Sequence, residues 1–160
     1  MKKLAEKKTN NKGFSLVELI IVVAIMAVLI GVLAPQYMRY LEKTRIQKDN
    51  SAISEIANAI KNAGSEETIY DEIATTGTTG VTIAATHTAN TNQKFSFGTS
   101  TKLQSELKIT IGDEVSTTSK QYKGGADLSF VVKIDANGIV EVTVKNWYDP
   151  ATKTTADKVF

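Results

Sequence analysis

The sequence contains no cysteine among its 160 residues. Disulfides, thiolate nucleophiles and cysteine-ligated metal sites are therefore excluded, and the fold must be held by packing and strand pairing. Histidine is also scarce, since His87 is the only one and lies in a threonine-rich stretch. With no cysteine and no second histidine, neither a zinc site nor a His-based triad is expected. These absences argue against an enzyme, a metal site and a bound cofactor.

Charge is unevenly spread along the chain, whose formal net charge is +2. Residues 1–13 hold five lysines against the single acid Glu6, whereas the remaining chain has 14 basic and 16 acidic residues. The weakly basic balance therefore comes from the first residues alone. No basic stripe follows later in the chain, so nucleic-acid binding is not expected.

A long apolar run follows these lysines, from Phe14 to Ala34. A helix of about 21 residues spans roughly 30 Å, the thickness of the hydrocarbon core of a bilayer. The preceding lysines predict that the N-terminus stays cytoplasmic and the rest faces outward. Glu18 is the exception inside this run, because a carboxylate near the membrane interior costs about 2–3 kcal/mol or more.

Three hypotheses account for this segment to different degrees. A secretory signal peptide requires a shorter apolar core and a small-residue cleavage site, and neither is present. A plain single-span anchor explains the lysines and the length but leaves Glu18 unexplained. The third hypothesis is that a peptidase cuts between Gly13 and Phe14. The new α-amine of Phe14 can then pair with Glu18 of a neighbouring copy, which offsets two costly charges and sets the register of assembly.

The combination of Gly13, Phe14, Ser15 and Glu18 with an apolar helix through Pro35 resembles the class III signal of type IV pilins. The resemblance covers residues 12–35 only, but the pattern is specific. It implies that a prepilin peptidase cleaves after Gly13 and methylates Phe14, and that Glu18 is needed for assembly. It also implies that the helix sits in the membrane before assembly and in the filament core afterwards. The missing cysteines favour a major pilin of a Gram-positive-type system.

The helix is expected to continue beyond the apolar run and to end near Gly64. Pro35 lacks a backbone donor and crowds the carbonyl of Gly31, which predicts a kink there and, by resemblance, partial melting in the fibre. From Tyr37 to Ala63 apolar residues recur at helical spacing among charged ones, which indicates an amphipathic helix. Tyr37 and Tyr40, with Arg39, are interpreted as an interfacial aromatic belt. The expected divisions are a cleaved leader at 1–13, a hydrophobic helix at 14–35, an amphipathic helix at 36–64 and a globular head at 65–160.

The head is expected to contain an antiparallel sheet that covers the amphipathic stripe, giving an α+β, pilin-like fold. Alternating patterns predict strands over 107–111, 128–134 and 139–147, and Asn137-Gly138 predicts a tight hairpin turn. Residues 65–74 indicate a short helix with Ser65 as N-cap, and residues 80–86 indicate a further short strand. The tail from 149 to 160 lacks periodicity, and we expect it to be held by packing of Trp147, Tyr148, Val159 or Phe160.

These observations point to a structural protein, the subunit of a type IV pilus. Such a chain is stored in the membrane, processed by prepilin peptidase and polymerised by the pilus assembly machinery into a helical surface filament for adhesion, twitching motility or biofilm formation. Two alternatives stay open: a pseudopilin or competence-type pilin of a secretion or DNA-uptake machine, and a membrane-tethered binding domain that never polymerises. Fibre length and replacement of Glu18 discriminate among them.

Overall fold

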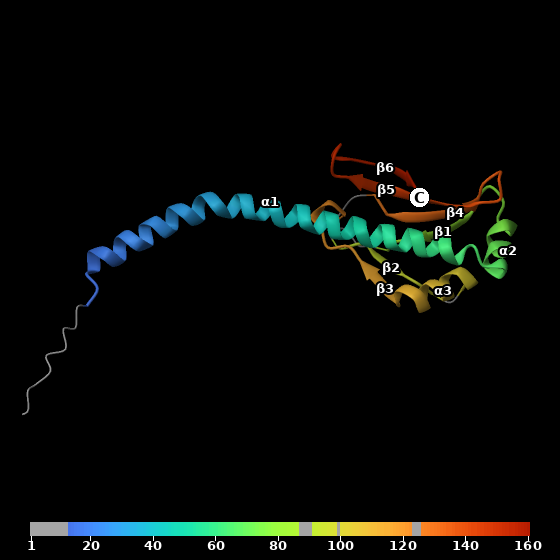
Figure 1. Ribbon diagram of the computed structural model, residues 1–160, viewed down its shortest axis with the longest axis horizontal. Coiled ribbons are helices and arrows are strands. Elements are labelled where there is room, and N and C mark those ends of the chain that lie inside the picture. The colour runs from blue at the N-terminus through green and yellow to red at the C-terminus, as the bar shows by residue number, and fades with distance from the viewer. Residues whose placement is uncertain (1–12, 87–90, 99, 123–125) are drawn as a thin grey trace, which may run out of the picture. The chain divides into compact units, whose positions relative to one another are not determined.

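The computed structural model describes residues 13–86, 91–98, 100–122 and 126–160 (Figure 1). His87 and the Lys123–Gly125 stretch lie outside these residues, as does nearly all of the lysine-rich leader. The chain divides into two compact units, of which the first ends at Tyr40 and the second spans Leu41–Phe160. A single helix, α1 (Leu16–Ala63), contributes to both units, and all other elements belong to the second.

Three helices, a 3-10 turn and six strands make up the described chain. The helices after α1 are α2 (Glu67–Thr75) and α3 (Lys102–Ile111), with the 3-10 turn η1 at Lys120–Tyr122. The strands are β1 (Val81–Ala84), β2 (Lys94–Ser96), β3 (Glu114–Ser116), β4 (Ser129–Ile134), β5 (Val140–Asp149) and β6 (Thr154–Val159).

The second half of α1 buries one narrow face in the core of the second unit. Ile53, Ile56, Ala57 and Ile60 are fully buried and recur at the three- and four-residue spacing of one helix face. The inward residues of the sheet, such as Val142, belong to the same hydrophobic cluster. The predicted α+β architecture, a long helix packed on an antiparallel sheet, is therefore confirmed.

The main sheet has the strand order β1-β4-β5-β6, and all neighbours are antiparallel. The expected β4–β5 hairpin is present and closes at the pair Ile134↔Val140. Its turn is longer than a two-residue Asn-Gly turn, because Asp135 N donates to Ile139 O at 2.9 Å and Gly138 N donates to Asp135 O at 3.1 Å. Gly138 has φ 78°, the left-handed conformation that favours glycine at this position of a three-residue loop.

The tail forms a strand that the lack of periodicity did not predict. All six residues of β6 are exposed, so no alternation of apolar and polar residues marks the strand, and backbone pairing with β5 holds it. Trp147 and Phe160 pack edge to face with ring centroids 5.6 Å apart, as the sequence suggested. The expectation was wrong for Val159, whose side chain is exposed.

The prediction of a strand over residues 107–111 was wrong, because this segment is the second half of α3. Thr101 caps the helix through a bond from Gln104 N to its hydroxyl at 3.1 Å. Leu103 and Leu107 are fully buried four residues apart, whereas Ile109 is 79% exposed. The true apolar spacing is therefore helical. The alternation over 107–111 arose because one exposed isoleucine lies between two inward-facing positions.

The short helix predicted over residues 65–74 is present as α2, but Ser65 is not its N-cap. The N-cap position belongs to Glu66, whose side chain makes no capping bond. The Ser65 hydroxyl instead donates to Lys61 O at 3.1 Å, which serves the end of α1. A serine in the short connection between two helices can bond either helix end, and here its hydroxyl bonds the C-terminal end of α1.

Acidic side chains of α1 hold the loop that precedes η1. Asp49 is only 3% exposed, and its carboxylate accepts bonds from Thr118 N at 2.8 Å, the Thr118 hydroxyl at 2.9 Å and Ser119 N at 2.7 Å. Two turns earlier on α1, the half-buried Glu42 accepts a bond from Lys120 N. We call these contacts the carboxylate strap. It joins α1 to a segment about 70 residues away in sequence.

A polar cluster beside the strap ties α1 to the end of β5. Asn50 donates to Tyr148 O at 3.0 Å and accepts from the Tyr122 hydroxyl at 2.6 Å. Burial raises the pKa of Tyr122 to about 12, so the phenol keeps its proton and its donor role. In a chain without cysteines, these hydrogen bonds supply the long-range ties between helix and sheet.

Candidate processing and assembly site

The residues singled out by the sequence lie at the start of α1. Gly13, Phe14 and Ser15 are not helical, and the helix begins at Leu16. Phe14 is 92% exposed, so the peptide bond between Gly13 and Phe14 lies in an open, non-helical stretch. An exposed chain next to a helix end is the kind of backbone that a peptidase can bind.

Ser15 and Glu18 form a capping box at this helix end. The Glu18 carboxylate accepts a bond from Ser15 N at 2.9 Å, and the Ser15 hydroxyl accepts one from Val17 N at 3.3 Å. The pair satisfies two backbone donors that an open helix end leaves without partners. The signal was present in the sequence, because a serine followed three residues later by a glutamate before an apolar run is the pattern of this motif. Glu18 was expected to act in assembly, and its role in capping the helix was not predicted.

The capping box gives the carboxylate of Glu18 a partner within its own chain. Carboxylates are stabilised at a helix N-terminus, because the free amides and the helix dipole both favour negative charge there. A hollow of about 440 Å³ lies beside the carboxylate and is lined by Phe14, Glu18, Leu19 and Val22. The site thus combines one acidic group with an apolar rim on the surface of a single helix.

The helix that follows exposes nearly all of its apolar side chains. Large hydrophobic residues from Leu16 to Leu33 are 48–73% exposed. An 18-residue window of α1 has a mean hydropathy of 3.1, and none of it is buried within the chain. By length and composition this helix can cross a membrane, and it is the one helix of that kind in the described residues. So much exposed apolar surface needs a partner other than water.

Gly31 and Pro35 lie within this apolar half. The helix assignment is continuous through Pro35, and a side chain at Gly31 would meet nothing within 4 Å. Packing within the single chain therefore does not require glycine at position 31. The kink and the melting expected around these residues stay predictions.

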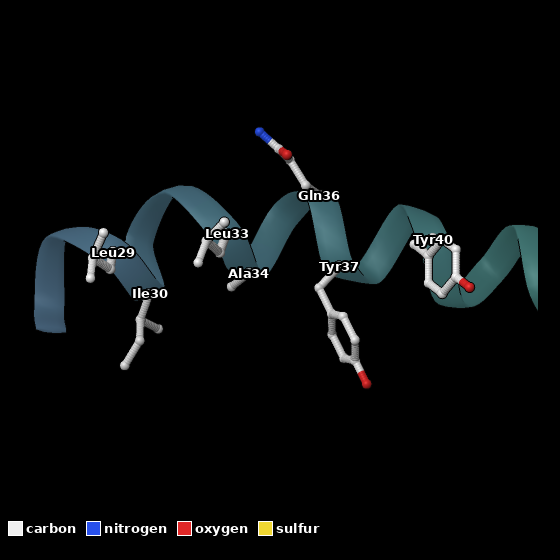
Figure 2. A pocket seen from close by; sticks show the side chains of 7 residues that line it. All are labelled: Leu29, Ile30, Leu33, Ala34, Gln36, Tyr37 and Tyr40. Carbon is white, nitrogen blue, oxygen red and sulfur yellow. The ribbon is translucent and has the colours of Figure 1, made fainter.

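An aromatic groove lies further along the same unit, where Tyr37 projects away from the helix and Tyr40 follows about one turn later (Figure 2). The groove has a volume of about 630 Å³, and its lining is almost wholly apolar. Both tyrosines are exposed, which agrees with the interpretation of an interfacial belt without testing it. The lining residues are Leu29, Ile30, Leu33, Ala34, Gln36, Tyr37 and Tyr40.

Within the described residues no group of three or more histidine, aspartate or glutamate side chains is arranged to hold a metal ion. Asp127, Asp135 and Asp149 do not form such a group. The Asp135 carboxylate instead accepts bonds from Asn137 N and Ile139 N, both at 2.8 Å. These bonds lower its pKa and close the hairpin loop.

Fold and site together define a class: an α+β protein whose first helix is long and apolar enough for a membrane and is preceded by a basic leader with a Gly-Phe junction. Residues 8–34 match the family model of the prokaryotic N-terminal methylation motif. The chain is 37% identical over 54 residues to the type IV major fimbrial protein FimA of Dichelobacter nodosus, which covers 34% of this chain and 35% of that protein. It is 40% identical over 52 residues to a fimbrial protein of Pseudomonas aeruginosa, covering 32% of this chain and 34% of that protein.

The family model covers residues 8–34 only, and the chain aligns with about a third of the length of these curated relatives. No solved structure matches the chain significantly. The methylation motif and the similarity to fimbrial proteins support a type IV pilin, and the helix-on-sheet fold agrees with it.

Proposed function

We propose that this chain is a structural subunit of a type IV pilus, polymerised into a helical surface filament. The observation that carries the proposal is the apolar half of α1, which bears the methylation motif and has no covering partner within its own chain. Such a helix is stable in a bilayer or against copies of itself, and a filament subunit needs both environments in turn. The pilin similarity also supports a non-enzymatic role.

Processing is the first step of the proposed function. The precursor is held in the membrane with its lysine-rich end in the cytoplasm, and a prepilin peptidase cleaves between Gly13 and Phe14 and methylates the new amine of Phe14. The open stretch around this bond supports access by the enzyme. Cleavage removes the basic leader, and with it the lysines that hold the N-terminus at the inner membrane face.

Assembly then depends on Glu18 exchanging one partner for another. In the single chain its carboxylate caps α1 through Ser15 N. In the filament the methylated amine of Phe14 on an adjacent copy offers a full positive charge in apolar surroundings. A charge pair of this kind is stronger than a bond to a neutral amide, and an unpaired member of it would be costly. Correctly aligned copies are therefore favoured over misaligned ones.

The N-terminal residue of the mature surface protein tests the processing step directly. Mass spectrometry of protein sheared from cells should find N-methylated Phe14 at the N-terminus. An intact Met1 on the surface protein would contradict cleavage and the proposed function with it.

Two substitutions of Glu18 distinguish the effect of its negative charge from the effect of its capping hydrogen bond. Glu18→Gln keeps a side-chain acceptor for Ser15 N but carries no charge, whereas Glu18→Ala removes both. We expect surface fibres to disappear in both variants, while leader cleavage still occurs. The measurement is electron microscopy of cells with quantitation of sheared fibres, and Glu67→Gln on α2 is the matched control. Normal fibres from Glu18→Gln would refute the charge-pairing role.

Fibres built in this way serve adhesion, surface motility or biofilm formation in the proposed function. A pseudopilin or competence-type role predicts short or sparse fibres, and a simple tether predicts none. The similarity to a major fimbrial protein of another organism supports long, abundant fibres.

A further inference from the structure

The turn of the β4–β5 hairpin contains a chemically reactive pair of residues, Asn137 and Gly138. Asn137 is the only asparagine of the sequence that is followed by glycine. Both residues are exposed, so water reaches the asparagine amide. Because Gly138 has no Cβ, its backbone nitrogen can approach the side chain of Asn137 with little steric hindrance, and asparagine is one of the heat-labile residues of proteins. The pair is therefore a candidate site of spontaneous covalent modification.

The reaction open to this pair is the loss of ammonia from Asn137. The backbone nitrogen of Gly138 attacks Cγ of the Asn137 amide and forms a five-membered succinimide ring. The C–N bond of the amide breaks, and its nitrogen leaves as ammonia with the proton that Gly138 N gives up. Water then opens the ring at one of its two carbonyls. One opening gives aspartate, and the other gives isoaspartate, whose main chain runs through the side-chain carbon.

Hydrogen bonds of the folded loop hold both reacting groups. Gly138 N donates to Asp135 O at 3.1 Å, so the attacking nitrogen is engaged. The Asn137 amide donates to the Asp135 carboxylate at 3.4 Å, and the backbone nitrogens of Asn137 and Ile139 donate to the same carboxylate at 2.8 Å each. Asp135 thus restrains the nucleophile through its backbone carbonyl and the leaving group through its side chain.

A tyrosine of α2 adds a long-range contact to the same loop. The Tyr70 hydroxyl donates to Gly138 O at 3.2 Å, and Val140, two residues further on, is buried in the core. Attack on Cγ of Asn137 requires the loop to open. The rate of modification therefore follows the fraction of molecules in which these hydrogen bonds are broken.

We propose that Asn137 is a site of spontaneous conversion to isoaspartate, and that Asp135 and Tyr70 set its rate by holding the loop closed. The chemistry goes beyond the proposed function and does not depend on polymerisation. Isoaspartate adds one carbon to the main chain of the three-residue loop and places a carboxylate beside that of Asp135, where like charges repel. Conversion thus weakens the turn of the hairpin.

Incubation of the detergent-solubilised full chain at neutral pH tests the site. Mass spectrometry of tryptic peptides detects the replacement of NH₂ by OH, and electron-transfer fragmentation distinguishes isoaspartate from aspartate. We expect conversion at Asn137 and little at Asn58, an exposed asparagine of α1 that is followed by alanine. The same chain in urea should convert Asn137 faster, because its loop is then open in every molecule.

Two variants test the control of the rate by the loop. Asp135→Ala removes the carboxylate that accepts three bonds, and conversion at Asn137 in the folded chain should become about three to ten times faster. Tyr70→Phe removes only the hydroxyl, and conversion should become about two to three times faster. Glu67→Gln on α2 is the control for both. All of these chains should convert at the wild-type rate in urea, where the loop contacts are absent.

Each part of the proposal can fail separately. The absence of isoaspartate at Asn137 in the folded chain would overturn the site. Equal rates in the folded wild type and in both loop variants would overturn the control by Asp135 and Tyr70. Neither result bears on filament assembly, which the fibres of the Glu18 variants test.

Discussion

Acidic residues of α1 have different effects because their surroundings differ. Glu18 stands at an exposed helix end and accepts one backbone bond, so its carboxylate is available for another partner. Asp49 is buried, and three donors of one loop surround its carboxylate. A buried carboxylate is tolerated only when its hydrogen bonds are complete, which makes Asp49 a fixed structural residue.

Asp49→Asn should therefore destabilise the head. An amide offers one acceptor oxygen, and its NH₂ group would face the backbone donors of Thr118 and Ser119. We expect a loss of about 2–3 kcal/mol in the free energy of unfolding, the usual cost of leaving buried donors of a charged partner unpaired. Urea denaturation of the detergent-solubilised chain measures it. Asp71→Asn, at an exposed position on α2, should change stability little; equal losses in the two variants would contradict the strap.

At this scale the sequence was informative where a residue violated its local pattern. Glu18 was conspicuous because an acid interrupts an apolar run. The capping-box pattern is present in the same segment, from Ser15 to Glu18. Asp49 gave no such signal, since an aspartate in an amphipathic helix is ordinarily a solvent-facing charge. Its partners lie about 70 residues away, and only the folded chain brings them together.

Elements held by a strong local signal were predicted well. The Asn-Gly turn between two alternating runs predicted the β4–β5 hairpin, and the spacing of isoleucines predicted the buried face of α1. The second half of α3 was mistaken for a strand because the pattern of residues 107–111 fits a two-residue as well as a helical period. Its helical character becomes clear only with Thr101 and Leu103, which precede that segment. β6 was missed because pairing with β5 and not burial holds it, so its side chains leave no pattern.

The two assignments for residues 107–111 differ in what they predict for substitutions. In α3, Leu107 is fully buried and Ile109 is exposed, whereas a strand would turn both side chains to the same face. Leu107→Ala should cost about 2–5 kcal/mol in the free energy of unfolding, and Ile109→Ala should stay within about 0.5 kcal/mol. Urea denaturation of both variants provides the comparison. Similar losses from the two would favour the strand and contradict α3.

The β5–β6 pairing carries an acid-sensitive contact. The ion pair and hydrogen bond with Lys145 lower the pKa of Asp157 below its usual range. Since the folded pKa is the lower one, the contribution is complete above the unfolded value of about 3.9 and is lost as the pH falls through the folded value. Asp157→Asn should therefore flatten the fall in melting temperature between pH 5 and pH 3. Glu67→Gln is the control, and a fall in Asp157→Asn as steep as that of the wild type would contradict the linkage.

At the scale of the whole molecule, the two units differ in how many hydrophobic side chains they bury. Every fully buried hydrophobic residue of the described chain lies between Ile53 and Tyr148, inside the second unit. The described part of the first unit, residues 13–40, buries no hydrophobic side chain within the chain. The boundary at Tyr40 coincides with the end of the aromatic groove.

A chain that begins at Leu41 should therefore fold by itself. It retains the core, both sheets and the carboxylate strap, and it loses only the exposed apolar helix. We expect a soluble monomer by size-exclusion chromatography with light scattering, with dispersed ¹H–¹⁵N NMR spectra and a melting temperature within a few degrees of the full chain in detergent. A chain that begins at Glu55 is the matched control, because it lacks Asp49 and Ile53 and should unfold or aggregate. Equal stability of the two truncated chains would contradict the role of the strap, and aggregation of the longer one would show that the head needs the apolar helix to fold.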